Sequence, residues 1–63
     1  MEHSEAIKKA ARLAKEIREP VYVVDTWTPD GHDCATERQM ALDLYYNTLE
    51  VVDVVHSDGS LES

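Results

Sequence analysis

The fold is decided by residues 21–28, Val21-Tyr22-Val23-Val24-Asp25-Thr26-Trp27-Thr28, which prolines enclose at positions 20 and 29. β-Branched and aromatic side chains favour the pleated, half-buried surface of a sheet, so this stretch predicts a strand. Pro29-Asp30-Gly31 has the residue types of a tight turn, and a short return strand is expected from His32 to Ala35. The centre of the chain is therefore predicted to be a β-hairpin.

Before this hairpin, apolar residues recur at helical spacing over residues 5–18, which predicts an amphipathic helix. Ser4 is expected to cap its N-terminus, and Pro20 disfavours helix at the preceding residue and so ends it. The apolar stripe is rich in alanine. Such a helix can approach another element closely, although it contributes little apolar area of its own.

After the hairpin, Thr36 and Gln39 have the spacing of a capping box, which predicts a second helix from Glu37 to Tyr46. A second strand is expected over residues 49–56, and Ser57-Asp58-Gly59 predicts a second turn. Residues 60–63 are either a frayed tail or a short extension of that hairpin.

These elements predict one α+β domain over residues 1–63, in the order helix, strand, short strand, helix, strand, with a three-stranded sheet and two helices. A sheet this small leaves edges that can pair with a second copy or a partner's strand. One cysteine excludes an internal disulfide framework. No apolar run approaches the roughly 20 residues that span a bilayer, and the first residues lack a signal-peptide pattern, so we expect a cytoplasmic protein.

The net charge of −7 on 63 residues is distributed unevenly. Residues 1–18 hold five basic and three acidic side chains, a net +2, whereas residues 19–63 hold ten acidic side chains against Arg38 alone, a net −9. Phosphate backbones and anionic membranes repel such a chain, so we expect neither direct nucleic-acid binding nor membrane binding. A basic protein surface is the partner that this charge favours.

Reactive side chains offer weak alternatives. His32 and Cys34 could bind zinc with His56 or an aspartate, but a second closely spaced ligand pair is missing. Cys34 could act as a nucleophile with a histidine base, but no oxyanion donors or orienting group can be identified. We therefore expect no catalytic residue, no metal and no cofactor, and a protein that is not an enzyme.

Two acidic residues interrupt apolar strand faces. Asp25 and Asp53 each lie in the middle of a predicted strand, on the same face as valines. Adjacent carboxylates could form an acid–base dyad. The preferred interpretation is a salt bridge from these carboxylates to the lysines and arginines of the first helix.

The candidate contact surface combines exposed acidic residues with an aromatic anchor. Its predicted members are Asp30, Asp33, Glu37, Asp43, Glu50 and Asp58, with Trp27 or Tyr46 as the anchor. The short length, the acidic stretch from Asp25 to Glu62 and the absence of a catalytic motif resemble the small acidic inhibitors that phages encode, including anti-CRISPR proteins. These inhibitors share no common fold, so no functional residue is transferred.

The resemblance implies a non-enzymatic protein that docks on a basic partner, such as a nuclease or a CRISPR-associated complex, and blocks its nucleic-acid site or a conformational step. The lysine-rich first helix departs from a uniform nucleic-acid mimic. The alternative is a small structural or assembly module that forms a homodimer through an open strand edge, with the acidic residues serving solubility.

Overall fold

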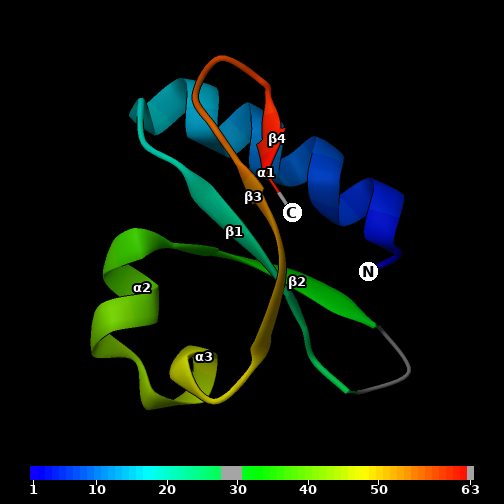
Figure 1. The fold of residues 1–63 in the computed structure, drawn as a ribbon, viewed down its shortest axis with the longest axis vertical. Helices are drawn as coiled ribbons and strands as arrows, with labels where there is room; N and C mark the ends of the chain where they lie inside the picture. The colour runs from blue at the N-terminus through cyan, green and yellow to red at the C-terminus, as the bar shows by residue number, and fades with distance from the viewer. Residues whose placement is uncertain (28–30, 63) are drawn as a thin grey trace.

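The computed structural model describes residues 1–27 and 31–62 as one α+β domain (Figure 1). The elements in chain order are α1 (His3–Ile17), β1 (Val21–Asp25), β2 (His32–Thr36), α2 (Glu37–Leu42), α3 (Leu44–Asn47), β3 (Glu50–Val55) and β4 (Leu61–Glu62). The strands form one antiparallel sheet in the order β2-β1-β3-β4. None of the helices described is long and apolar enough to cross a membrane.

The α+β class is confirmed, but the predicted count of three strands and two helices is wrong. The fourth strand arises because residues 61 and 62 pair with Val55 and Val54 after the turn, which extends the hairpin by two residues. The extra helix arises because the predicted second helix breaks at Asp43. Asp43 has an extended backbone (φ −99°, ψ 114°), and its Oδ1 accepts a hydrogen bond from Tyr45 N at 2.9 Å, which caps α3.

The capping box at the start of α2 is confirmed. Thr36 N donates to Gln39 Oε1 at 2.9 Å, and Gln39 N donates to Thr36 Oγ1 at 3.2 Å. At the other end of the chain, α1 begins at His3 with Glu2 at the N-cap, not at Ser4, and Arg18 ends it in the left-handed conformation (φ 58°).

Helix α1 packs on one face of the sheet through three alanines. Ala6, Ala10 and Ala14 are fully buried and lie one turn apart, so they form a stripe along the helix. This stripe contacts a core of β-sheet valines that includes Val23 and Val55. Since alanine has no atoms beyond Cβ, the helix backbone approaches the sheet closely.

Strand β1 lies in the centre of the sheet and pairs with β2 on one side and β3 on the other. A bulge interrupts the second pairing: Val23 opposes Asp53, whereas Val24 opposes Val51, so Val52 is the additional residue. The bulge lies between two carboxylates of β3. Glu50 precedes it at the start of the strand, and Asp53 follows it and bonds to His3 of α1.

The outer edge of β2 is closed by contacts within the chain. Thr26 N donates to Gly31 O at 3.1 Å, so the alternate residues 32, 34 and 36 direct their backbone groups away from β1. Each of these outward N–H groups has an acceptor: Met1 O for His32 (3.1 Å), Asp33 Oδ1 for Cys34 (2.8 Å) and Gln39 Oε1 for Thr36 (2.9 Å). Among residues 32–36, the edge that was expected to be open therefore has no outward N–H donor left for a further strand.

Candidate partner-binding site

Two carboxylates oppose each other where β1 ends and β3 begins. Asp25 is the cross-strand partner of Glu50. Cβ atoms of directly opposed residues lie roughly 4.5–5.5 Å apart, and like charges in such pairs destabilise a sheet. Within residues 1–27 and 31–62, the ion pairs are His3–Asp53 and His56–Glu62, so neither Asp25 nor Glu50 has a Lys or Arg partner.

Trp27 lies beside this carboxylate pair and is 69% exposed. Its backbone N–H donates to Asp25 Oδ1 at 2.9 Å, and its backbone is left-handed (φ 56°), which is uncommon for a residue other than glycine. The hydrogen bond ties the conformation of the tryptophan backbone to the carboxylate. We call Asp25, Trp27 and Glu50 the acidic corner.

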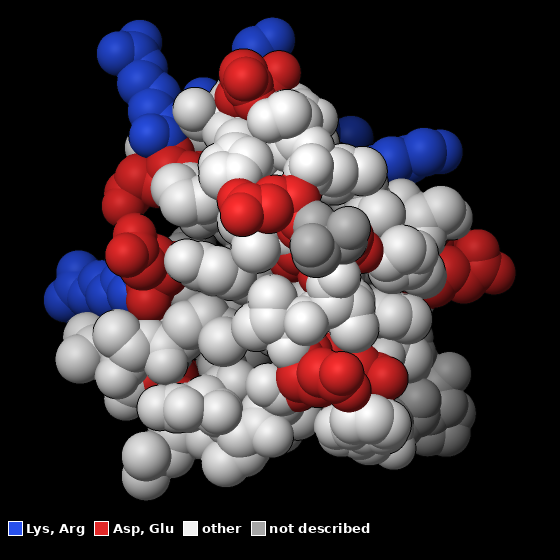
Figure 2. All heavy atoms as spheres, in the orientation of Figure 1, with Lys and Arg blue, Asp and Glu red and all other residues white. Residues whose placement is uncertain are grey.

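The acidic corner has the groups that bind a Lys or Arg side chain. Carboxylates form charge-assisted hydrogen bonds with an ammonium or guanidinium, and an indole face attracts a cation. On the face drawn in Figure 2, acidic side chains lie over the sheet, including its lower end, whereas Lys and Arg lie around the periphery. A basic partner approaching this face meets negative charge first.

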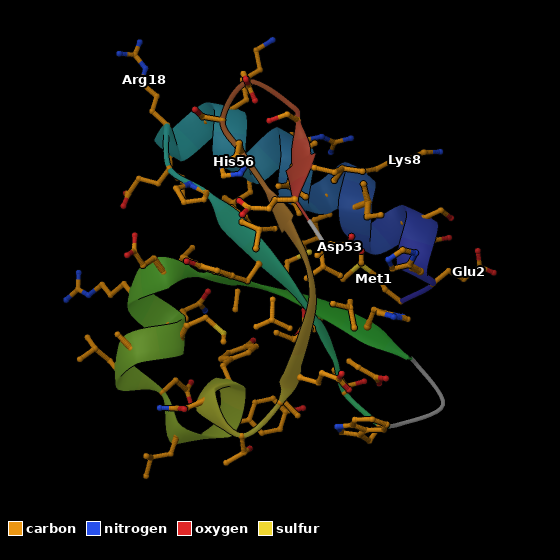
Figure 3. The ribbon with its side chains drawn as sticks, viewed as in Figure 1. Met1, Glu2, Lys8, Arg18, Asp53 and His56 are labelled. Carbon is orange, nitrogen blue, oxygen red and sulfur yellow. The ribbon has the colours of Figure 1, made fainter. Side chains whose placement is uncertain are left out.

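The expected salt bridges from both strand acids to the lysines and arginines of α1 are not found in the described part of the chain. Asp53 is nearly buried (9% exposed), and its Oδ2 lies 2.5 Å from His3 Nε2, so its partner on α1 is a histidine. Figure 3 shows Asp53 close to the first turns of α1. Asp25 bonds to the backbone of Trp27 instead. The sequence analysis missed this role, which the spacing of Asp25 two residues before Trp27 could have indicated as an Asx turn.

Cys34 is buried in the core, and its thiol is engaged in a hydrogen bond to the backbone of α1. Cys34 Sγ donates to Ala6 O at 3.1 Å, and burial, followed by the nearby Asp33 charge, raises the pKa of the thiol. The ring of His32 packs instead against the ring of His3, with centroids 4.9 Å apart. No group of three or more His, Cys, Asp or Glu side chains in residues 1–27 and 31–62 is arranged to hold a metal ion.

The raised pKa of Cys34 predicts a loss of stability at alkaline pH. The unfolded thiol ionises near its ordinary value of 9.0, whereas the folded thiol stays protonated to higher pH. The free energy of unfolding should therefore fall as the pH rises above about 9. Urea titrations at several pH values should show that the stability difference between the wild type and Cys34→Ala narrows above that pH. A constant difference would contradict the raised pKa, since the tyrosines titrate in both proteins.

Two predicted contact residues, Tyr46 and Asp33, bond to each other within the chain. Tyr46 and Asp33 are both half-buried, and Tyr46 Oη donates to Asp33 Oδ2 at 3.2 Å. Burial and the Asp33 charge raise the pKa of Tyr46. Since Asp33 Oδ1 also accepts from Cys34 N, both of its oxygens are engaged within the chain.

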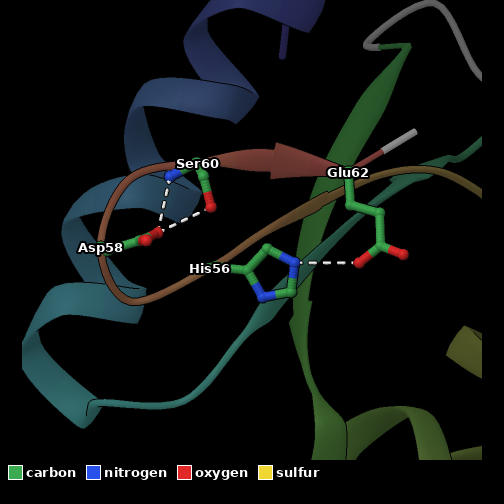
Figure 4. A network of polar contacts seen from close by, with 4 residues as sticks. All are labelled: His56, Asp58, Ser60 and Glu62. Carbon is green, nitrogen blue, oxygen red and sulfur yellow. Dashed lines mark hydrogen bonds and ion pairs between the residues drawn. The ribbon is translucent and has the colours of Figure 1, made fainter.

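The other predicted acids lie on separate parts of the surface. Asp58 is in the turn between β3 and β4, where its carboxylate accepts hydrogen bonds from Ser60 N (2.9 Å) and Ser60 Oγ (2.7 Å), which lower its pKa (Figure 4). It lines a groove of about 420 Å³ with Arg12 and Lys15 of α1, at the opposite end of β3 from Glu50. Glu37 and Asp43 are exposed on α2 and between α2 and α3, and Asp30 lies outside the described residues.

A further exposed surface was not predicted. Leu42, Leu44 and Tyr45 are 73%, 81% and 53% exposed at the junction of α2 and α3. Arg38 and Asp43 line a hollow of about 550 Å³ with the two leucines. The break at Asp43 turns these apolar residues outward.

Three comparisons with known proteins give no relative for this chain. No protein-family model matches it, and no similar curated protein or solved structure was found. The functional assignment therefore rests on the geometry of the chain's own residues.

Proposed function

We propose that this chain is a non-enzymatic binding protein that docks on a basic surface of another protein, with the acidic corner as its principal contact. The observation that supports this proposal is the opposed pair Asp25 and Glu50, which has no Lys or Arg partner among the described residues and lies beside the exposed Trp27. The pair opposes folding, because like charges face each other across the strands. A Lys or Arg from a partner removes that repulsion on binding.

The proposed contact needs both charge and apolar area. Carboxylates increase the rate of encounter with a basic surface, whereas an aromatic side chain buried at the centre of an interface supplies much of the affinity. Trp27, the only tryptophan in the chain, is the aromatic residue of the acidic corner. Protein surfaces that bind nucleic acid are rich in Lys and Arg, so a protein bound there competes with the nucleic acid and inhibits the partner.

Capture experiments test the proposed function. Wild-type protein and the Trp27→Ala variant are immobilised in parallel, exposed to a bacterial lysate, and washed at low and at high salt. We expect a nucleic-acid-binding protein to be retained by the wild type, to be released by salt, and to bind the variant about tenfold more weakly, an effect equivalent to about 1.4 kcal/mol. Retention of the same protein by both, without salt dependence, would contradict the proposal.

A homodimer is the second candidate, and the apolar residues between α2 and α3 favour it. Three large apolar side chains exposed within four positions are typical of a protein contact. Sedimentation at increasing protein concentration distinguishes the candidates. A dimer that Leu44→Ser abolishes would support the assembly module, whereas a monomer at all concentrations would exclude it.

A further inference from the structure

Strand β3 is longer than the strand that covers its outer side. It runs from Glu50 to Val55, but β4 pairs with Val54 and Val55 alone. Within the described residues, no strand pairs with Glu50–Asp53 on the side away from β1. These four residues extend over roughly 13 Å. Backbone groups alternate in direction along a strand, so those of this stretch that do not point toward β1 form an edge where a further strand can bind.

The open edge adjoins a hollow on the sheet face opposite α1. The hollow has a volume of about 300 Å³ and is lined by Tyr22, Val52 and Val54, with Glu62 and His56 at one side. Cross-strand partners share a face of a sheet, and Tyr22, Val54 and Glu62 form one such row. His56 Nε2 lies 2.9 Å from Glu62 Oε2 (Figure 4). A strand added beside β3 would direct alternate side chains toward this hollow.

The charges around the edge indicate which strand it accepts. Glu50 begins the open stretch and Glu62 lines the adjoining hollow, whereas the carboxylate of Asp53 is nearly buried and already bonded to His3. A second copy pairing through the same edge would bring two such sets of carboxylates together, and each copy carries a charge of −7. Like charges across strands are destabilising, whereas a segment with Lys or Arg would form opposite-charge pairs. The edge of β2 is not available, because its outward N–H groups are bonded within the chain.

We infer that the partner contributes an extended segment rich in Lys or Arg, which adds as a strand along Glu50–Asp53 and places a basic side chain in the hollow near Glu62. This inference rests on the proposed function and specifies how the basic partner is bound. Backbone hydrogen bonds supply affinity in this mode of recognition, and the alternate side chains supply specificity. The acidic corner lies at the start of the same edge, so one segment contacts both.

Three peptides of equal length test the inference. One alternates Lys and Thr, one alternates Lys and Pro, and one alternates Glu and Thr. Emission of Trp27 reports binding at the acidic corner, and amide hydrogen exchange of residues 50–53, followed by NMR, reports strand addition. We expect the Lys–Thr peptide to bind about tenfold more tightly than the Lys–Pro peptide, because proline cannot donate to the ladder, and to slow exchange at this edge. The Glu–Thr peptide should not bind.

The outcomes separate the inference from the proposed function. Equal binding of the two Lys peptides, with unchanged exchange at residues 50–53, would overturn strand addition and leave the basic-surface docking intact. Failure of both Lys peptides to change Trp27 emission would overturn the proposed function as well. Matched variants test where the basic side chain lies. Glu62→Gln should weaken binding of the Lys–Thr peptide, whereas Glu16→Gln on the exposed side of α1 should not. Equal effects of these two variants would contradict the position near Glu62.

Discussion

Replacing Ala10 with leucine should destabilise the protein by about 1–3 kcal/mol, the usual cost of overpacking a core. Ala10 is the middle residue of the buried stripe on α1 and has no exposed surface. The three additional carbons of leucine at this position, a methine and two methyl groups, must displace the helix from the valines of β1 and β3. A domain of 63 residues is typically stable by roughly 3–9 kcal/mol, so the loss is a large share of the total.

The control for this prediction is Ala41→Leu on α2. Ala41 is exposed, and the same substitution there should change the free energy of unfolding by less than about 0.5 kcal/mol. Urea denaturation of both variants gives the comparison. Equal effects at the two positions would show that α1 does not pack closely on the sheet, and the described fold would then be wrong in its main contact.

Much of the fold could be predicted because the relevant signals are local. The valine-rich run of β1, the return strand β2 and the capping box at Thr36 depend on residues close together in the sequence. Each of these elements is confirmed, although β1 ends at Asp25 and does not include Thr26 and Trp27. The end of the second helix could not be predicted in this way. Leu42, Leu44 and Tyr45 fit a continuing helix, but the carboxylate of Asp43 caps a new helix instead.

The candidate site was predicted in part, because its composition is local and its assembly is not. Trp27 and Glu50 were named from residue type as candidate contact residues. Their proximity follows from the pairing of Asp25 with Glu50, which depends on the register of β1 with β3 and on the bulge at Val52. No periodicity in the sequence specifies a bulge. The same register places Asp53 where it bonds to His3.

Glu50→Lys should change stability and partner binding in opposite directions. The substitution replaces a repulsive cross-strand pair with Asp25 by an attractive one, which should raise the free energy of unfolding by about 0.2–1 kcal/mol. It also removes negative charge where a basic partner is proposed to bind, so affinity for the Lys–Thr peptide should fall by about tenfold or more. Urea denaturation measures the first effect and Trp27 emission measures the second.

Glu19→Lys is the matched control, because it makes the same change in net charge at an exposed position outside the acidic corner. Glu19→Lys should reduce the affinity for the Lys–Thr peptide far less than Glu50→Lys does. If both variants lose affinity equally, net charge explains the binding and the acidic corner has no special role. A loss of stability in Glu50→Lys would contradict the claim that the carboxylate pair opposes folding.

The central claim, that the acidic corner binds a basic partner, is tested most directly by titrating the wild type and Glu50→Lys with the Lys–Thr peptide over a range of salt concentrations, using Trp27 emission. The account predicts that wild-type affinity falls steeply as salt rises, since opposite charges are screened, and that Glu50→Lys binds weakly with a shallower dependence on salt. Identical affinities and identical salt dependences for the two proteins would contradict it.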